Sequence, residues 1–139
     1  MSDTVLLIED DELIRSELKG LLEGEAYKVH VSRNGAEALE LLTRVEVPNC
    51  ILLDMMMPIM SGAQFLAALR DDRRLSKIPV VLTSGWMHEW TSKMADVERI
   101  EVLPKPLNPD RLLQAVARHC RDGERPPRHG NRQRTDSRN

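Results

Sequence analysis

Acidic, hydroxyl and lysine side chains recur in this chain directly after short apolar runs. Glu9 and Asp10 follow the first run, and three later runs lead to Asp54, Thr83 and Lys105 in turn. If these runs are parallel strands, their carboxyl ends meet at one edge of the sheet, where open α/β sheets build their sites. The chain therefore predicts a carboxylate cluster with one hydroxyl and one cation, which suits a hard metal ion and a phosphoryl group.

The elements that must position these residues alternate between two hydrophobic patterns. Apolar runs predict strands at residues 5–8, 51–53, 79–82 and 102–103, and a partly alternating pattern predicts another at residues 29–31. Helical spacing predicts helices at residues 12–24, 35–44 and 88–97, and two more that begin after the N-cap residues Ser61 and Asn108. This repeated strand–helix alternation predicts an α/β fold, a doubly wound parallel sheet with right-handed crossovers and helices on both faces.

The composition fits one domain followed by a basic tail. The chain has 139 residues, of which 41% are hydrophobic and 30% charged, enough to bury a core. Residues 121–139 carry six Arg, three acidic residues and almost no apolar side chain, which predicts a disordered tail of net charge +3. The formal net charge is −2, so the remaining body carries about −5, which argues against nucleic acid as its main ligand. The tail could still contact nucleic-acid phosphates or an acidic partner.

The cysteines and the first residues carry little functional signal. Two cysteines do not make a disulfide framework. Cys50 lies in a strand-like run and is expected to be buried, whereas Cys120 ends the last helical pattern and could be exposed. The first residues lack a basic region and a long apolar run, so we expect no signal peptide, no membrane span and a cytoplasmic location. The four histidines show no metal-ligand spacing.

Glu9, Asp10 and Asp54 are predicted to lie together, since the first and third strands of a doubly wound sheet are neighbours. Crowded carboxylates repel one another unless a cation sits among them, and a few oxygen ligands favour Mg²⁺. The alternative is a solvated acidic turn before a helix start, which leaves Asp54 unexplained. Asp54 is a candidate nucleophile that would form an aspartyl phosphate, with Lys105 offsetting the phosphoryl charge and Thr83 donating a hydrogen bond to it.

This combination resembles the receiver domain of two-component response regulators. The matching residues extend over about residues 4–120, and they are Glu9-Asp10, Asp54, Met57-Pro58, Gly62, Thr83-Ser84 and Lys105-Pro106. Each piece alone is common, whereas the combination is highly specific. The resemblance implies a flavodoxin-like (βα)5 three-layer sandwich with five parallel strands in the order 2-1-3-4-5. It also implies a receiver domain at residues 1–120, with the disordered tail at residues 121–139.

The resemblance assigns a metal site and a phosphoacceptor. Asp54 matches the residue that accepts the phosphoryl group. Glu9 and Asp10 match the acidic pair that binds Mg²⁺, with Asp10 as the direct ligand, and Asp54 shares this metal. The backbone carbonyl of Met56 matches the third protein ligand. These assignments rest on positions that correspond to the family pattern.

The resemblance also assigns a switch, and here the chain departs from the family. Thr83 matches the switch hydroxyl, and Lys105 matches the lysine that pairs with the phosphoryl group. The bond from Lys105 to Pro106 is expected to be cis, as it usually is in the family. Family members usually carry an aromatic residue three positions before the lysine, where this chain has Val102. Val102 cannot swing inward as the aromatic residue does when the threonine moves.

The resulting prediction is a single-domain response regulator and not a metabolic enzyme. A histidine kinase or a histidine phosphotransfer protein would donate the phosphoryl group, and output would pass to a downstream protein target or through a phosphorylation-dependent homodimer. The alternative is a phosphorylation-independent adaptor that uses an apolar face around Trp86–Met94, although packing of that face against the sheet also explains the pattern. A phosphohydrolase would need a second Asp two residues after the nucleophile, where the chain has Met56.

Overall fold

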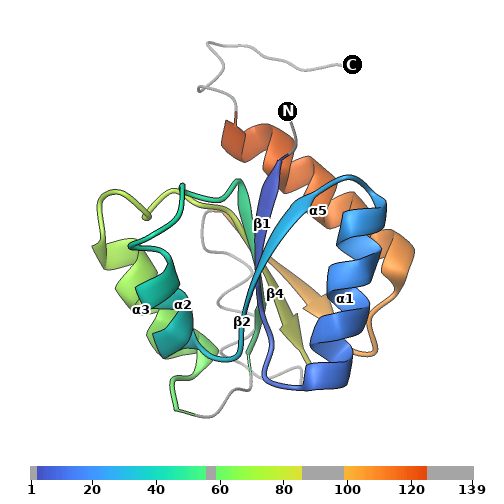
Figure 1. The fold of residues 1–139 in the computed structure, drawn as a ribbon, viewed down its shortest axis with the longest axis horizontal. Helices are drawn as coiled ribbons and strands as arrows, with labels where there is room; N and C mark the ends of the chain where they lie inside the picture. The colour runs from blue at the N-terminus through green and yellow to red at the C-terminus, as the bar shows by residue number, and fades with distance from the viewer. Residues whose placement is uncertain (1–2, 56–58, 86–98, 125–139) are drawn as a thin grey trace.

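The computed structural model describes residues 3–55, 59–85 and 99–124, and in them five parallel strands form one sheet (Figure 1). The strand order is β2-β1-β3-β4-β5, which confirms the order that the family resemblance implies. The strands are β1 (Thr4–Ile8), β2 (Lys28–Ser32), β3 (Cys50–Asp54), β4 (Val80–Ser84) and β5 (Ile100–Pro104).

Helices cover both faces of this sheet, as predicted for a doubly wound fold. Figure 1 shows α1 and α5 on one side of the strands and α2 with α3 on the other. The helix predicted at residues 88–97 lies outside the described residues. The described helices are α1 (Glu12–Gly24), α2 (Gly35–Leu41), α3 (Gly62–Asp71) and α5 (Pro109–Glu124).

Polar N-cap side chains start these helices shortly after the strands. Ser61 forms a capping box with Gln64, in which each side chain bonds the other residue's backbone N–H. Asn108 accepts hydrogen bonds from the backbone N–H groups of Asp110 and Arg111, which confirms it as the cap of α5. Asp11 caps α1 in the same way, so the carboxylates at the end of β1 stand at a fixed helix start.

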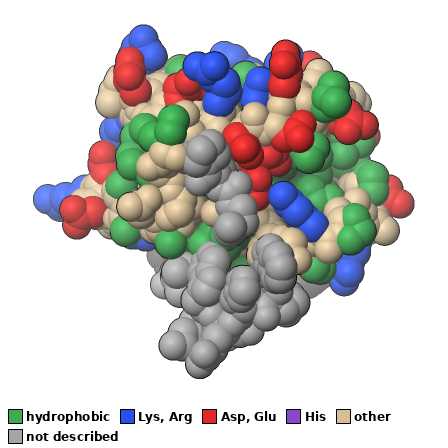
Figure 2. Space-filling view, turned by 90° about the horizontal axis from the view of Figure 1, so that it is seen from below, with side chains coloured by type: hydrophobic (Ala, Val, Ile, Leu, Met, Phe, Trp, Pro, Cys, Tyr) green, Lys and Arg blue, Asp and Glu red, His purple; other side chains and the backbone are tan. Residues whose placement is uncertain are grey.

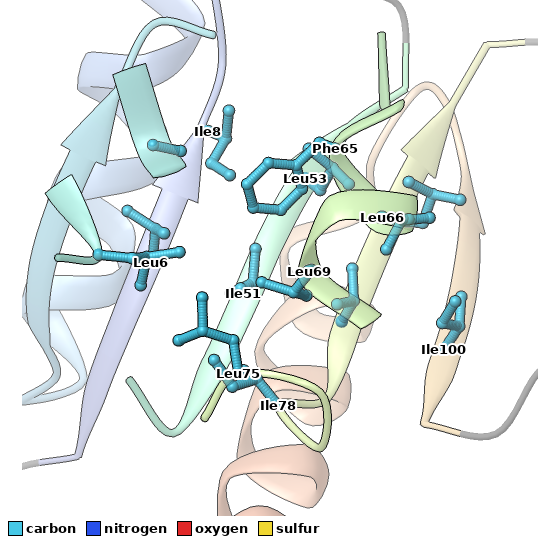
Figure 3. Close-up of a cluster of buried hydrophobic side chains, with 14 of the residues drawn as sticks. Leu6, Ile8, Ile51, Leu53, Phe65, Leu66, Leu69, Leu75, Ile78 and Ile100 are labelled. Carbon is cyan, nitrogen blue, oxygen red and sulfur yellow. The ribbon is translucent and has the colours of Figure 1, made fainter. Parts of the chain in front are cut away.

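Two hydrophobic clusters hold the layers together, one on each face of the sheet. Alternate residues of each strand point to opposite faces, so Leu6 and Ile8 enter one cluster while Val5 and Leu7 enter the other. Figure 3 shows the first cluster, in which Phe65 and Leu69 of α3 lie over the strands. Because both faces are covered, the central strands β1, β3 and β4 are nearly continuous apolar runs, whereas the edge strands β2 and β5 carry polar residues such as His30 and Glu101.

The strand bounds differ from their predictions by one or two residues, and the lengths of two elements, α2 and β5, differ the most. α2 ends at Leu41 and not at Arg44, since the N–H groups of Thr43 and Arg44 bond carbonyls three residues back, which closes the helix in a tight turn. β5 is longer than the apolar pair at residues 102–103, because its backbone pairs with β4 from Ile100 to Pro104. Strand length here follows backbone pairing, which the side-chain pattern does not report.

The C-terminal helix corrects two further predictions. Cys120 is buried, and not exposed as its position at the end of the pattern suggested, because it continues the buried stripe of Leu112 and Val116 at a spacing of four residues. α5 also runs to Glu124, so the helix extends four residues into the segment predicted to be disordered from residue 121. A helical backbone satisfies its own hydrogen bonds, so it can continue past its last buried residue.

Candidate functional site

The strand register brings the predicted site residues to one end of the sheet. Asp54 is the last residue of β3 and lies beside Thr83 of β4 in the parallel register. Glu9 directly follows β1, the other neighbour of β3, and Lys105 directly follows β5. Four residues from separate parts of the chain therefore meet where the sequence predicted, at the carboxyl ends of the strands.

Three carboxylates lie together at this end. Carboxylate oxygens of Glu9, Asp10 and Asp54 all lie within 4.8 Å of one another. Glu9 and Asp54 are buried, with 3% and 5% of their surface exposed, whereas Asp10 is exposed. Figure 2 looks onto this end of the molecule and shows acidic side chains gathered near its centre, with basic side chains beside them. Asp10 is therefore the carboxylate of this cluster that is most open to solvent.

The environment of Glu9 disfavours its charged form. Burial is the main cause, and the nearby Asp54 carboxylate adds to it, while a hydrogen bond from the Asp11 backbone N–H and the charge of Lys105 act in the opposite direction. Together these effects raise the pKa of Glu9 to about 7. Near neutral pH the carboxyl group of Glu9 is therefore partly protonated. A cation in the cluster would favour its charged form.

Lys105 supplies the cation on the other side of Asp54. Its Nζ lies 3.1 Å from Asp54 Oδ1, and its side chain is 31% exposed while that of Asp54 is 5% exposed. The backbone holds Lys105 in place, because its N–H donates to the carbonyl of Ser84 at 2.8 Å. The bond between Lys105 and Pro106 is cis, as predicted.

Thr83 is buried beside Asp54, but its hydroxyl is engaged elsewhere. Thr83 Oγ1 donates to the backbone carbonyl of Leu53 at 3.4 Å, a long and weak hydrogen bond. The predicted hydrogen bond from Thr83 to a phosphoryl oxygen would replace this contact. The backbone carbonyl of Met56, which is also a predicted metal ligand, lies outside the described residues.

Gly62 packs closely against Met55, the residue that follows Asp54. The Gly62 N–H donates to the carbonyl of Met55 at 3.1 Å. A Cβ added at Gly62 would lie 2.5 Å from Met55 Sδ and 3.0 Å from Met55 Cα, so a side chain there would clash with Met55. The glycine of the sequence motif is thus a packing requirement next to the phosphoacceptor position.

The donor set fits a magnesium ion. Mg²⁺ prefers oxygen ligands, usually from one or two carboxylates, with water completing its coordination. Glu9, Asp10 and Asp54 provide such oxygens within reach of one another, and two of them are buried where an uncompensated charge is costly. The described part of the cluster therefore has both the ligand type and the electrostatic need for a divalent cation.

Arg15, whose side chain bonds the backbone of the acidic pair, was not predicted from the sequence. Its Nη1 donates to the backbone carbonyls of Glu9 at 2.9 Å and Asp10 at 3.4 Å. The available signal was spacing, since Arg15 follows Asp11 by four residues and so stands one turn along the helix that Asp11 caps.

Comparison with known sequences places this arrangement in a family. The sequence profile of the response regulator receiver domain matches residues 5–117. The chain belongs to the response regulator receiver domain family. The polar-differentiation response regulator DivK of Brucella anthropi is 30% identical over 128 residues, which cover 88% of this chain and 99% of that protein.

Two further proteins are similar to this receiver domain, and the domain covers different shares of their lengths. The probable transcriptional regulator ycf29 of Pyropia yezoensis is 33% identical over 117 residues, or 84% of this chain, but this chain spans only about half (52%) of that protein. The receiver domain of a signal transduction histidine kinase from Syntrophus aciditrophicus superimposes with a TM-score of 0.81 at 26% identity, covering 91% of this chain and 96% of that one. Receiver domains are signalling domains, which supports a phosphoacceptor role and does not favour the adaptor alternative.

Proposed function

We propose that this receiver domain accepts a phosphoryl group on Asp54 in a Mg²⁺-dependent reaction and signals through protein contacts. The observation that carries the proposal is the pairing of a buried Asp54 with Lys105 at 3.1 Å, beside two further carboxylates. A nucleophile, a cation and a metal-binding acid pair together are the parts that phosphoryl transfer requires.

Each residue has a distinct part in the proposed reaction. An oxygen of Asp54 attacks phosphorus, the bond from phosphorus to the donor breaks, and the product is an aspartyl phosphate. Glu9, Asp10 and Asp54 would hold Mg²⁺, which when bound offsets charge on the transferring oxygens. Lys105 offsets charge from the opposite side, and Thr83 turns its hydroxyl from the Leu53 carbonyl to a phosphoryl oxygen.

The phosphoryl donor is proposed to be a histidine kinase or a histidine phosphotransfer protein, as the membership of the two-component family suggests. An apolar groove of about 480 Å³ lies between α1 and the start of α5, lined mainly by Ile14, Leu18, Leu21, Leu107 and Leu112. Lys105 also lines this groove, so a helical donor seated there would bring its phosphohistidine to the site.

The output is proposed to pass through a protein surface. Phosphorylation adds negative charge at a buried position, which biases the local structure around Thr83. Val102 packs partly buried against the first hydrophobic cluster, so the proposed movement of Thr83 does not use an aromatic side chain at position 102. A downstream protein target or a phosphorylation-dependent homodimer would bind the altered surface, while the negative charge of the body argues against nucleic acid as its ligand.

The protein is proposed to act in the cytoplasm, where its donors present their phosphohistidines. Among the described residues, no helix has both the length and the apolar character needed to cross a membrane. The proposed chemistry is limited to the domain's own phosphorylation and dephosphorylation, so the domain is a phosphoacceptor and not a metabolic enzyme.

The test is the intact mass of the full chain after incubation with acetyl phosphate and Mg²⁺. We expect one phosphoryl adduct in the wild type, and none with EDTA. Asp54→Asn should remove the adduct, because an amide does not replace the carboxylate nucleophile. Asp71→Asn is the matched control, since Asp71 is an exposed residue at the end of α3 and its substitution should leave the adduct intact.

Two results would overturn this proposal. An adduct that persists in Asp54→Asn would place the phosphoryl group elsewhere. The absence of an adduct from acetyl phosphate, followed by the absence of label from a phosphorylated histidine phosphotransfer protein, would favour the phosphorylation-independent adaptor. The predicted Trp86–Met94 face, which lies outside the described residues, would then be tested for partner binding.

A further inference from the structure

Hydrogen bonds hold both ends of the loop at residues 9–11, which carries the acidic pair. The Glu9 N–H donates to the carbonyl of Ser32 at 3.0 Å, which ties the loop to β2. The Asp11 N–H donates to Glu9 Oε2 at 3.2 Å, and the Asp11 carboxylate accepts from the first N–H groups of α1. The direction of the Glu9 and Asp10 side chains depends on how the two peptide groups between these anchors are turned.

Arg15 bonds both of these peptide groups. Its Nη1 donates to the Glu9 carbonyl at 2.9 Å and to the Asp10 carbonyl at 3.4 Å, and the side chain is half-buried. One nitrogen that bonds two successive carbonyls turns both toward itself. A guanidinium is well suited to this because its planar group is pre-organised and always charged.

The charge of Arg15 and its hydrogen bonds act on a cation in opposite directions. As a positive charge close to the acidic loop, Arg15 repels an incoming divalent cation. As a donor to the loop carbonyls, it fixes the carboxylates of Glu9 and Asp10 in one arrangement before the cation arrives, which favours binding. The sign of the effect of removing Arg15 therefore shows which of the two contributions is larger.

We propose that Arg15 is a positioning residue for the metal site, and that its hydrogen bonds to the Glu9 and Asp10 carbonyls strengthen Mg²⁺ binding more than its charge weakens it. This inference rests on the proposed Mg²⁺ binding and adds to it a residue that does not touch the metal. Residues that orient metal ligands typically contribute 10–100-fold to metal affinity.

The test is a calorimetric titration of Mg²⁺ into the full chain. Arg15→Met should weaken Mg²⁺ binding by roughly ten-fold, because it removes both hydrogen bonds to the loop. Arg15→Lys keeps the charge and a shorter donor, so its affinity should lie between those of the wild type and Arg15→Met. Lys19→Met is the matched control, since Lys19 lies one turn further along α1 and pairs with Glu23 at 3.0 Å.

A second measurement works without metal. In EDTA, amide hydrogen exchange at residues 9–11 should be faster in Arg15→Met than in the wild type, whereas exchange in β3 and β4 should be unchanged. Lys19→Met should leave the exchange of the loop unchanged. A purely electrostatic role of Arg15 would not alter exchange at this loop alone.

The outcomes separate this inference from the proposed function. If the wild type does not bind Mg²⁺, the proposed function fails, and exchange in EDTA still decides whether Arg15 orders the loop. If the wild type binds and Arg15→Met binds equally or more tightly, the positioning role is wrong. If Arg15→Met does not fold, Arg15→Gln replaces it with the same expected loss.

Discussion

Glu9 is buried and Glu101 is half-buried, and the environments of these two glutamates shift their pKa values in opposite directions. Glu9 lies among other carboxylates, and its pKa is raised to about 7, mainly by burial. Burial also raises the pKa of Glu101, but hydrogen bonds from Arg118 and His119 outweigh it and lower the pKa overall. Glu101 accepts from Arg118 at 2.5 Å and lies 2.7 Å from the His119 ring nitrogen, so β5 is fastened to α5.

The difference shows how to distinguish a structural acid from a functional one. Glu101 has two basic partners within the fold, so its charge is satisfied without any ligand. Glu9 is buried next to other acids, and Lys105, the basic side chain that pairs with Asp54, offsets only part of the repulsion. A buried acid whose charged form is disfavoured beside other carboxylates marks a candidate cation site.

The largest effect is expected from removing the positive charge of Lys105 beside Asp54. Lys105→Met should slow phosphoryl uptake from acetyl phosphate by roughly 100-fold, because one charge-stabilising donor is lost at the transferring group. The measurement is the initial rate of adduct formation by intact mass at saturating Mg²⁺. Arg118→Met, which removes a cation from the Glu101 cluster, is the control and should leave the rate unchanged.

This prediction would be wrong if both substitutions slowed the reaction equally. Equal slowing would mean that the two ion pairs act through the stability of the fold and not through the chemistry. Urea unfolding of both variants would then show a common loss of stability. We expect instead that the rate and the stability respond to different substitutions.

The next effect concerns the stability of the metal-free protein. Glu9→Gln should raise the free energy of unfolding in EDTA at pH 8 by on the order of 2 kcal/mol, because it removes a buried charge that the fold disfavours. The folded pKa of about 7 lies above the ordinary value of 4.5, so the wild type loses stability as the pH rises through this window. The gain from Glu9→Gln should therefore nearly vanish at pH 4.5.

Urea unfolding at the two pH values measures this difference. In the presence of Mg²⁺ the order should reverse, because the wild-type carboxylate then has a cation and the amide binds the metal more weakly. A variant that is less stable than the wild type at pH 8 in EDTA would mean that Glu9 is a satisfied structural acid like Glu101.

The sequence predicted the fold and the acidic site because both depend on local patterns. Continuous apolar runs marked the parallel strands, and N-cap residues such as Ser61 and Asn108 marked helix starts. Parallel strands align their carboxyl ends, so the strand-end positions of Asp54 and Lys105, together with the strand order that the family resemblance implies, predicted that they lie close together.

What the sequence could not predict depends on contacts between distant elements. The pairing of Glu101 with His119 joins a strand to a helix, and neither residue belongs to a motif. The burial of Cys120 followed from which face of α5 meets the sheet, and the last residue of a helical pattern is the least certain to be covered. The raised pKa of Glu9 likewise depends on the depth of burial and on its distance from Asp54.

The smallest effect is expected from substituting Glu101, whose charge is compensated by Arg118 and His119. Glu101→Gln should lower the free energy of unfolding at pH 7 by about 0.5–1 kcal/mol, a modest loss because Arg118 is about half exposed and solvent screens the pair. The folded pKa of Glu101 lies below 4.5, so its contribution is present above pH 4.5 and is lost as the pH falls through the folded value. Urea unfolding at pH 7 and pH 4 should show the difference between variant and wild type shrinking toward pH 4, with Glu23→Gln as an exposed control.

Phosphoryl uptake should be unchanged, since Glu101 lies near the start of β5 and the site lies past its end. A slower uptake in Glu101→Gln would show that the two ends of β5 are coupled, and the separation between structural and functional acids would then fail.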